Sequence, residues 1–378
     1  MTRRVLLPSL AALALAACAV PPPPQMPSPP APSAPPPAMP TPAPAPTVSP
    51  LPPYSPAMEA GWRADFARDT ARRYGIPQAQ VEAVLARASV RDSIVAAMSR
   101  PAEAKPWRDY RPIFIQPSRI DGGRAFLDRH RAALQRAEDR YGVPKEIIVA
   151  IIGVETSYGG NKGSHGVVDA LYTLAIAYPR SGKPEQVARE ISRQAFFRDE
   201  LSQLFQLARD ESLELGALKG SYAGAMGWGQ FMPSSYRDYA VDGDGDGRRD
   251  LFNNLDDVFA SVANYFAKKG QWQRGGPVMQ RALRDPGAAD FANPGNSVTL
   301  DQTLATLAAA GYRPAVTPPP GAASQPVTLI TLDGVAGPEY WIVYNNFKAI
   351  TTYNISRLYA TAVYQLSRAI AGQEPVAP

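Results

Sequence analysis

The sequence predicts a mainly α protein of the α+β class, with a small β insertion late in the chain. Three observations support this prediction. Apolar residues recur at helical spacing over most of residues 58–269. Glycines follow several of these segments, as expected where helices end. Two short runs rich in β-branched and aromatic residues appear only after residue 326, and the 378-residue chain contains no internal repeat.

The expected helices follow one another with short connections. Gly75, Gly142 and Gly270 end three of them, and Pro144 begins another, because proline is tolerated at the start of a helix. The helices are expected at 58–74, 78–98, 122–141, from Pro144 to soon after Glu155, 166–178, 184–215, 254–269 and 355–371, with a weaker helical pattern at 300–310. Strands are expected at 327–332 and 340–344, joined by a turn at Asp333-Gly334.

The first 17 residues have the pattern of a signal peptide: basic residues at the start, an apolar stretch and a small-residue cleavage site. Leu15-Ala16-Ala17-Cys18 resembles the bacterial lipoprotein box, which implies that Cys18 is lipidated and anchors the protein to a membrane. Because position 19 is not aspartate, the resemblance implies the periplasmic face of the outer membrane. The alternative is a spare thiol in an ordinary cleaved signal.

Residues 18–56 are rich in proline and predict an extended spacer, with a ligand for a proline-reading module as the alternative. The body, 57–378, is long enough for one large domain or two smaller ones. Its mildly basic balance, +5 for the whole chain, suits an anionic polymer, but no aromatic-basic motif indicates nucleic acid. The two histidines, His130 and His165, do not have metal-ligand spacing.

Glu155 ends an apolar run and is the first candidate for chemistry. On a helix it lies on the face of Ile148, Ile151 and Ile152, which should be buried. Burial and the negative end of the helix dipole both raise the pKa of a carboxyl group, as a general acid requires. The alternative is a glutamate paired with an Arg or Lys. The later carboxylates Asp169, Glu190 and Glu200 look like solvated helix positions.

Two further segments carry groups suited to a sugar ligand. Residues 221–236 combine small residues, aromatic rings and the hydrogen-bonding side chains of Ser221 and Gln230, although a tight Gly-rich turn packed on the core is an alternative. Residues 353–359 place Asn354 between two tyrosines near a helix start, where Asn354 could simply be a cap.

Residues 242–253 match the calcium-loop pattern, with acids at loop positions one, three and five and glycine at six. Position twelve holds Asn253 where a bidentate glutamate is usual, so we expect a weak structural calcium site. A merely acidic turn is the alternative. The expected ligands are the side chains of Asp242, Asp244, Asp246 and Asp250 and the backbone carbonyl of Arg248, with Asn253 at the twelfth position.

Together these segments resemble the membrane-bound lytic murein transglycosylase B family, over about residues 58–370. The motifs are Val154-Glu155-Thr156 with Gly159, the run 223–235, the calcium-like loop and Tyr353-Asn354. The resemblance implies a lysozyme-like helical core at about 110–270 and 345–372, an added N-terminal helical part, and a β-containing insertion at 271–344. It also implies that Glu155 is the single catalytic acid and base, in a sugar cleft lined by Tyr110, Ser221, Gln230, Tyr265, Tyr353, Asn354 and Tyr359.

The implied substrate is the glycan strand of peptidoglycan, cleaved between N-acetylmuramic acid and N-acetylglucosamine. The implied product carries a 1,6-anhydromuramic acid end, and the chemistry requires no cofactor. Other wall-remodelling proteins are further candidate partners. Two alternatives are a lysozyme-type hydrolase, which needs a second carboxylate, and a glycan-binding lipoprotein without activity.

Overall fold

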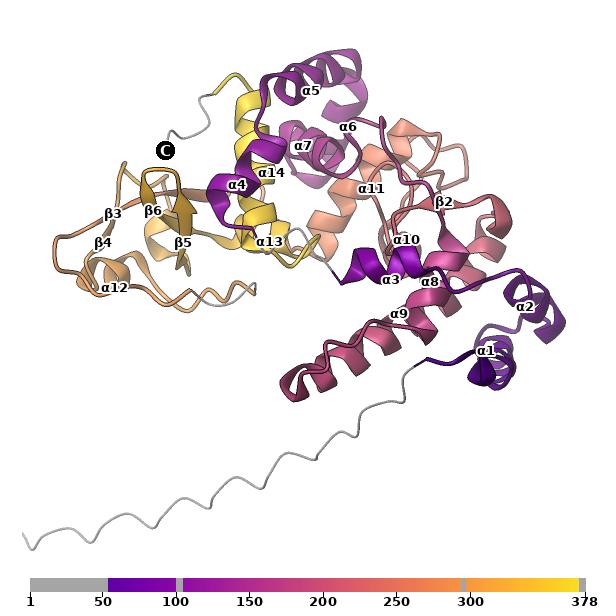
Figure 1. The fold of residues 1–378 in the computed structure, drawn as a ribbon. Helices are drawn as coiled ribbons and strands as arrows, with labels where there is room; N and C mark the ends of the chain where they lie inside the picture. The colour runs from indigo at the N-terminus through magenta and orange to yellow at the C-terminus, as the bar shows by residue number, and fades with distance from the viewer. Residues whose placement is uncertain (1–53, 100–104, 294–296, 374–378) are drawn as a thin grey trace, which may run out of the picture. The chain divides into compact units, whose positions relative to one another are not determined.

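The computed structural model describes residues 54–99, 105–293 and 297–373 (Figure 1). The predicted signal peptide, Cys18 and all but the last three residues of the predicted spacer lie outside the described residues. Of these three, Pro56 already begins a short 3-10 helix, η1 (Pro56–Met58). Among the described residues, no helix combines the length and the apolar character needed to cross a bilayer.

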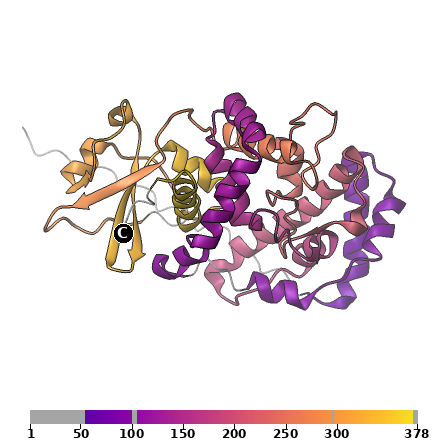
Figure 2. The same ribbon diagram turned by 90° about the horizontal axis from the view of Figure 1, so that it is seen from above.

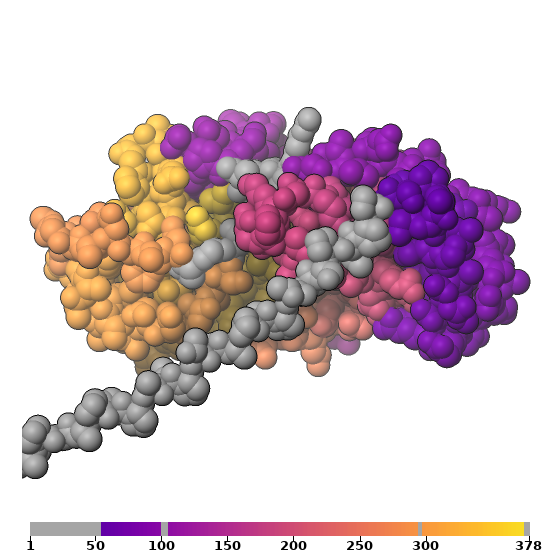
Figure 3. Space-filling model, turned by 60° about the horizontal axis from the view of Figure 1, so that its bottom comes forward, coloured from indigo at the N-terminus to yellow at the C-terminus, as the bar shows by residue number. Residues whose placement is uncertain are grey.

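Most of the described chain is helical, as predicted. The sheet lies toward one end of this body and the N-terminal helices toward the other (Figures 2 and 3). The helices are α1 (Glu59–Tyr74), α2 (Gln78–Leu85), α3 (Asp92–Met98), α4 (Trp107–Phe114), α5 (Pro117–Arg129), α6 (Arg131–Tyr141), α7 (Lys145–Thr156), α8 (Val167–Ile176), α9 (Val187–Asp210), α10 (Pro233–Tyr239), α11 (Leu255–Lys268), α12 (Leu304–Ala309), α13 (Asn345–Thr351) and α14 (Arg357–Ile370). Three more 3-10 turns are η3 (Pro184–Gln186), η4 (Leu215–Ala217) and η5 (Ala322–Ser324).

The single helix predicted at 78–98 is wrong, because the chain breaks between α2 and α3. At the break, the backbone N–H groups of Ser89 and Arg91 donate to side chains of α8, Asp169 Oδ1 and Thr173 Oγ1, both at 3.0 Å. These tertiary hydrogen bonds replace helical ones, so the backbone stays satisfied without a continuous helix.

Two other predicted helices have different limits. The helix predicted at 122–141 begins earlier, at Pro117, and divides at His130 into α5 and α6. The helix predicted at 184–215 is shorter, because its first turn is η3 and Ser212, after its end, has a left-handed backbone (φ 54°). The predicted ends at Gly75 and Gly142 are confirmed, since both glycines are left-handed caps (φ 63° and 76°).

The insertion forms a four-stranded antiparallel sheet with strand order β4-β3-β6-β5. The strands are β3 (Met279–Arg284), β4 (Tyr312–Pro314), β5 (Thr328–Gly334) and β6 (Gly337–Val343). Only β5 and β6 are predicted by the sequence; β3 and β4 lie among Gly and Pro residues that obscure their alternation. The turn predicted at Asp333-Gly334 lies two residues later, since Gly334 pairs with Gly337 across Val335 and Ala336.

Helix α7 is the centre of the helical core. It contacts α5, α6, α11 and α14, and its residues from Ile147 to Gly153 are all buried. The predicted buried face is therefore confirmed, with Ile148, Ile151 and Ile152 fully inaccessible. A second two-stranded sheet, β1 (His165–Gly166) with β2 (Lys219–Gly220), brings the chain after α7 beside the Gly-rich segment that begins at Ser221.

Candidate active site

Glu155 is the penultimate residue of α7, at the point where this buried helix reaches the surface of the core. Its side chain is half-buried, whereas the residues from Ile147 to Gly153 are buried. Tyr359 Oη donates a hydrogen bond to Glu155 Oε1 at 2.5 Å. The geometry therefore presents one oriented carboxyl group at the end of a rigid element, which is where a proton-transferring group is best positioned.

Tyr359 lies in the first turn of α14 and is almost completely buried, at 3% exposure. Burial, and secondarily the nearby Glu155 carboxylate, raises the pKa of Tyr359 well above its usual value. The phenol thus stays protonated and remains a hydrogen-bond donor at every physiological pH.

Tyr353 connects the site to the Gly-rich segment. Its Oη donates to the carbonyl of Gly229 at 2.6 Å, and its ring lies 4.9 Å from the ring of Tyr265. Burial raises the pKa of Tyr353 well above its usual value, and Glu155 adds to the increase. A Cβ at Gly229 would lie 2.9 Å from Tyr353 Oη, so only glycine lets the loop approach this closely.

The two remaining predicted tyrosines come from other helices. Tyr265 of α11 is buried, its Oη donates to the carbonyl of Thr352 at 2.5 Å, and burial raises its pKa to about 12. Tyr110 of α4 is 2% exposed and contributes to the raised pKa of Tyr359. In the structure, Tyr353 and Tyr359 thus lie near enough to Glu155 for its charge to affect both phenols. Tyr110 lies near Tyr359, and the ring of Tyr265 packs against the ring of Tyr353. Sugar contacts by these rings stay a prediction.

Ser221 and Gln230 have clear roles within their own loop. Ser221 Oγ accepts hydrogen bonds from the backbone of Ala225 (3.1 Å) and Ala223 (3.3 Å). Gln230 has a left-handed backbone (φ 51°), and its Nε2 donates to the carbonyl oxygens of Gly227 (3.0 Å) and Lys162 (3.2 Å). These bonds fit the alternative of a tight turn, and substrate binding by the two side chains stays a prediction.

Asn354 is not a helix cap, so that alternative is wrong. Ser356 is the N-cap of α14, and its Oγ accepts from the backbone of Tyr359 at 3.2 Å. The carbonyl of Asn354 accepts from the backbone of Ser356 at 2.7 Å. Asn354 is half-buried beside Tyr353, and its contact with substrate stays a prediction.

A feature that the sequence analysis missed fixes the end of α7. Ser157 and Tyr158 both have left-handed backbones (φ 50° and 59°), a strained conformation for residues other than glycine. The Tyr158 ring lies against Gly153 of α7 and Gly123 of α5, where an added Cβ would come within 2.6 Å and 2.5 Å of its Oη. Tyr158 Oη donates to the carbonyl of Arg119 at 2.8 Å. The signal that could have revealed this packing is Gly153, a helix-weakening residue in an otherwise apolar helix.

Thr156 joins the same helix end to the Gly-rich segment. Its Oγ1 lies 3.1 Å from the carbonyl oxygens of Ile152 and Trp228, to which it can donate, and accepts from the backbone of Gly159 at 3.2 Å. A Cβ at Gly159 would lie 2.3 Å from the Trp228 ring. These contacts therefore fix the end of α7, which carries Glu155, in position relative to the Gly-rich segment.

The three later carboxylates are all engaged elsewhere. Asp169 forms an ion pair with Arg91 at 2.7 Å. Glu190 accepts from the backbone of Ser181 at 2.8 Å, and Glu200 accepts from the backbone of Ser234 at 2.9 Å and from its hydroxyl. The prediction that Glu190 and Glu200 are solvated is wrong: their exposures are 9% and 2%, because α9 packs against neighbouring segments.

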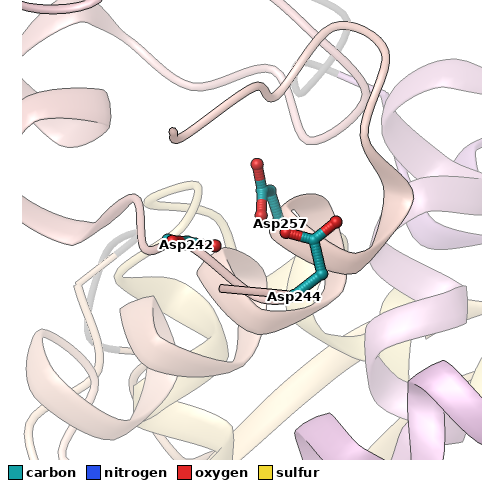
Figure 4. Close-up of side chains that lie close together, drawn as sticks. All are labelled: Asp242, Asp244 and Asp257. Atoms are coloured by element: carbon teal, nitrogen blue, oxygen red, sulfur yellow. The ribbon is translucent and has the colours of Figure 1, made fainter. Parts of the chain in front are cut away.

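The acidic loop and the first turn of α11 bring three carboxylates together, from Asp242, Asp244 and Asp257 (Figure 4). One oxygen of each lies within 4.8 Å of the others, as ligands of a single cation would. Asp257 is fully buried in the first turn of α11 and accepts from the backbone of Gly243 and Asp250, both at 2.7 Å. Burial raises the pKa of Asp257. The sequence analysis missed Asp257 because it lies beyond the twelve-residue loop.

The side chains of the other predicted ligands form hydrogen bonds within the loop. Asp246 Oδ1 accepts from the backbone of Arg248 at 2.8 Å. Asp250 Oδ1 accepts from the backbone of Phe252 and Asn253, and Asn253 Nδ2 donates to Asp250 Oδ2 at 3.0 Å. Asp246 and Asp250 are not part of the three-carboxylate group found among the described residues. Asp257, and not Asn253 at the twelfth loop position, completes the group of three carboxylates found among the described residues.

Comparisons with known proteins place this geometry in a family. The model of the transglycosylase SLT domain matches residues 58–368. The chain is 39% identical over 317 residues to membrane-bound lytic murein transglycosylase B of Escherichia coli K12, covering 81% of each protein.

Solved structures of other proteins have a similar fold over most of this chain. Soluble lytic transglycosylase SltB1 from Pseudomonas aeruginosa has a TM-score of 0.71 and 42% identity, covering 82% of this chain and 98% of that one. Escherichia coli lytic transglycosylase Slt35 in complex with calcium has a TM-score of 0.69 and 38% identity, covering 81% and 91%. Pseudomonas aeruginosa SltB3 in complex with NAG-anhNAM-pentapeptide has a TM-score of 0.70 and 29% identity, covering 83% and 80%. The chain therefore belongs to the transglycosylase SLT domain family, and it is a lytic transglycosylase with a lysozyme-like helical core and a small β insertion.

Proposed function

We propose that this protein cleaves the glycan strands of peptidoglycan between N-acetylmuramic acid and N-acetylglucosamine, with Glu155 as the single catalytic carboxyl group. The observation that carries the proposal is the hydrogen bond from Tyr359 to Glu155 Oε1, because it orients one carboxyl group at the end of α7 among buried tyrosines. The relative from Escherichia coli is named as a murein transglycosylase, and SltB3 has been solved in complex with NAG-anhNAM-pentapeptide.

In the proposed reaction, protonated Glu155 gives its proton to the glycosidic oxygen as the bond breaks. The carboxylate that results then takes the proton of the 6-hydroxyl of the muramic sugar. That oxygen bonds to the anomeric carbon, which closes a 1,6-anhydro ring without consuming water. Glu155 is protonated again at the end, so the atoms and charges balance.

A single carboxyl group suffices for this cycle, and the surroundings of Glu155 support it. A lysozyme-type hydrolase would need a second carboxylate to act on water or on the sugar. Three carboxylates near Glu155 in sequence, those of Asp169, Glu190 and Glu200, are held by Arg91, Ser181 and Ser234 respectively. This arrangement favours internal attack by the sugar over hydrolysis.

The acidic loop is proposed to bind a structural calcium ion through Asp242, Asp244 and Asp257. The three carboxylates lie close enough to share one cation, and Slt35 has been solved in complex with calcium. The ion would link the loop to the first turn of α11. Oxygen ligands of this kind suit calcium, and the ion takes no part in the chemistry.

Attachment to a membrane through lipidated Cys18 is the remaining part of the proposal. Its support is the sequence Leu15-Ala16-Ala17-Cys18 and the name of the membrane-bound relative. We place the protein at the periplasmic face of the outer membrane, with the spacer between the lipid and residue 57. A Cys18→Ser variant should lose incorporation of labelled fatty acid; unchanged labelling would exclude lipidation at this residue.

Mass spectrometry of soluble products from peptidoglycan sacculi tests the reaction. Products with anhydromuramic ends, absent with Glu155→Gln, are expected. Reducing-end products would instead establish a hydrolase. Retained binding without any product from the unmodified protein would leave a glycan-binding protein.

A further inference from the structure

Trp228 connects the Gly-rich segment to the acidic loop, residues 242–253. Its backbone N–H donates to the carbonyl of Leu251 at 3.1 Å, and its indole Nε1 donates to the carbonyl of Phe252 at 3.0 Å. Leu251 and Phe252 are consecutive residues near the end of the loop. Because the two bonds use the backbone and the side chain of one residue, they fix both the position of Trp228 and the direction of its ring.

The two carbonyl groups that Trp228 uses are themselves held by the helices beyond the loop. The backbone N–H of Leu251 donates to Tyr236 Oη of α10 at 3.0 Å. The backbone N–H of Phe252 donates to Asp250 Oδ1 at 2.8 Å, and the backbone N–H of Asp250 donates to Asp257 Oδ2 of α11 at 2.7 Å. Tyr236 and Asp257 are both fully buried. The loop therefore offers Trp228 a fixed support.

On its other side, Trp228 contacts the end of α7. Its carbonyl oxygen lies 3.1 Å from Oγ1 of Thr156, which directly follows Glu155 and is 1% exposed. The same hydroxyl accepts from the backbone N–H of Gly159 at 3.2 Å. The indole ring packs directly on this backbone, since a Cβ at Gly159 would lie 2.3 Å from it. Trp228 thus touches the helix end with both its carbonyl and its ring.

The contacts of the indole ring indicate a joint between protein segments and not a platform for a sugar. The ring is half-buried, with Lys162 Nζ 5.2 Å from its centroid and the ring centroid of Phe126 6.0 Å away. The side chain has a single hydrogen-bond donor, which the carbonyl of Phe252 already uses. The protein itself therefore occupies the groups that a sugar would need.

The backbone after α7 needs such support because it is strained. Ser157 and Tyr158 have left-handed conformations, with φ of 50° and 59°. Conformations of this kind persist only where the surrounding structure holds them. Glu155 lies two residues before this strained pair, so a relaxation there would move its carboxyl group. A displacement of about 1 Å at a catalytic group can cost about a hundredfold in rate.

We infer that Trp228 is a positioning residue for the reaction, which holds the end of α7 against the acidic loop and so keeps Glu155 in the geometry for proton transfer. The inference rests on the proposed function, because it concerns the orientation of the proposed acid. Tyr359 holds the carboxyl group from α14, and Trp228 holds the backbone that carries it from the opposite part of the chain. The acidic loop thereby gains a role in the reaction as the support of Trp228.

The variant Trp228→Phe tests the inference. It keeps an aromatic ring beside Gly159 and removes only the donor to Phe252 and part of the ring. Its matched control is Trp272→Phe, because Trp272 is also half-buried and its Nε1 has no hydrogen-bond partner among the described residues. On soluble glycan fragments we expect Trp228→Phe to lower kcat about tenfold with KM unchanged, as misplacement of the acid implies. The control should keep both values.

A pair of variants at Thr156 tests the same connection from the side of the helix. Thr156→Val removes the hydroxyl at nearly constant size and should lower kcat to a similar extent, whereas Thr156→Ser keeps the hydroxyl and should retain most of the rate. Thr156→Val combined with Trp228→Phe should be about as slow as the slower single variant, since both interrupt one connection. Multiplied losses would show independent effects and overturn the inference. The Thr156 pair also decides if Trp228→Phe does not fold.

Hydrogen exchange followed by mass spectrometry gives a readout that does not need activity. In Trp228→Phe, a peptide covering 155–163 should exchange faster than in the unmodified protein, whereas peptides of α14 should not change. Trp272→Phe should leave both unchanged.

Several outcomes contradict the inference. Unchanged kcat and exchange in Trp228→Phe would leave Trp228 without a positioning role, and a rise of KM alone would assign the ring to sugar binding. Equal losses in Trp228→Phe and Trp272→Phe would indicate a general effect of replacing tryptophan. Should the unmodified protein cleave no glycan, the proposed function fails instead, and the exchange of 155–163 still decides whether Trp228 holds this segment.

Discussion

The phenol of Tyr359 donates a hydrogen bond to the carboxylate of Glu155 at 2.5 Å, across a sequence separation of 204 residues. The bond joins the last turn of α7 to the first turn of α14, two helices in direct contact at the centre of the core. Ser356 fixes the start of α14 as its N-cap and so fixes the donor. Orientation of the acid is therefore a property of the whole core and not of the Glu155 segment alone.

Replacement of Tyr359 by phenylalanine should lower kcat by about tenfold to a hundredfold with little change in KM, since a hydrogen bond to a charged group is worth about 1.5–3 kcal/mol. Loss of the donor also disfavours the ionised form of Glu155. The alkaline limb of the pH–rate profile should therefore move to higher pH. Steady-state kinetics on soluble glycan fragments checks both effects; an unchanged kcat would remove Tyr359 from the mechanism.

Substitution of Gly153 by alanine should destabilise the protein by about 1–3 kcal/mol, although alanine normally favours a helix by about 1 kcal/mol over glycine. The reason is that the new Cβ would lie 2.6 Å from Tyr158 Oη. Gly61→Ala in α1 is the matched control, because nothing lies within 4 Å of its added Cβ, and it should leave stability unchanged or increase it. Urea unfolding measures both, and equal effects at the two sites would show that the Tyr158 packing is unimportant.

Addition of calcium should raise the melting temperature of the unmodified protein, and a chelator should reverse the rise. In Asp257→Asn the calcium-dependent part should disappear, because one of the three clustered carboxylates loses its charge. Asp246→Asn should keep most of it, since Asp246 lies outside that group. Comparing each variant with and without calcium separates ion binding from a general loss of stability. A full response in Asp257→Asn would contradict the proposed ligand set.

Glu200 should make the protein less stable as the pH rises. Its burial raises the pKa of the carboxyl group above the usual value, so the folded state holds the proton more tightly than the unfolded state does. The contribution of Glu200 to stability is complete below its unfolded pKa and is lost as the pH rises through the folded pKa. Unfolding in urea at several pH values from 4 to 8 should show a decline that Glu200→Gln lacks. Exposed Glu185→Gln should behave like the unmodified protein; identical slopes for all three would contradict the prediction.

Several elements of the fold and site follow from local pattern. The isoleucines of α7 recur with helical period and are buried as expected, and Gly75 and Gly142 end helices because they adopt left-handed conformations at little cost. Glu155 is identified by the contrast between its charge and its apolar neighbours. The strands β5 and β6 are visible in their branched and aromatic composition.

Other features depend on partners that are distant in sequence. The break between α2 and α3 exists because Asp169 and Thr173 of α8 accept the backbone hydrogen bonds there. Asp257 joins Asp242 and Asp244 only after α11 packs against the loop. The left-handed backbone of Tyr158 is retained because its ring fits between Gly123 and Gly153.

The sequence by itself determined the helical class of this protein, the acid at the end of a largely apolar helix and the family to which it belongs. These follow from hydrophobic period, chain breakers and motifs, all of which act over a few residues. Only the tertiary structure decided which groups orient Glu155 and which carboxylates can share a cation. Such relations depend on distances between helices, and these distances are set by the packing of the whole core.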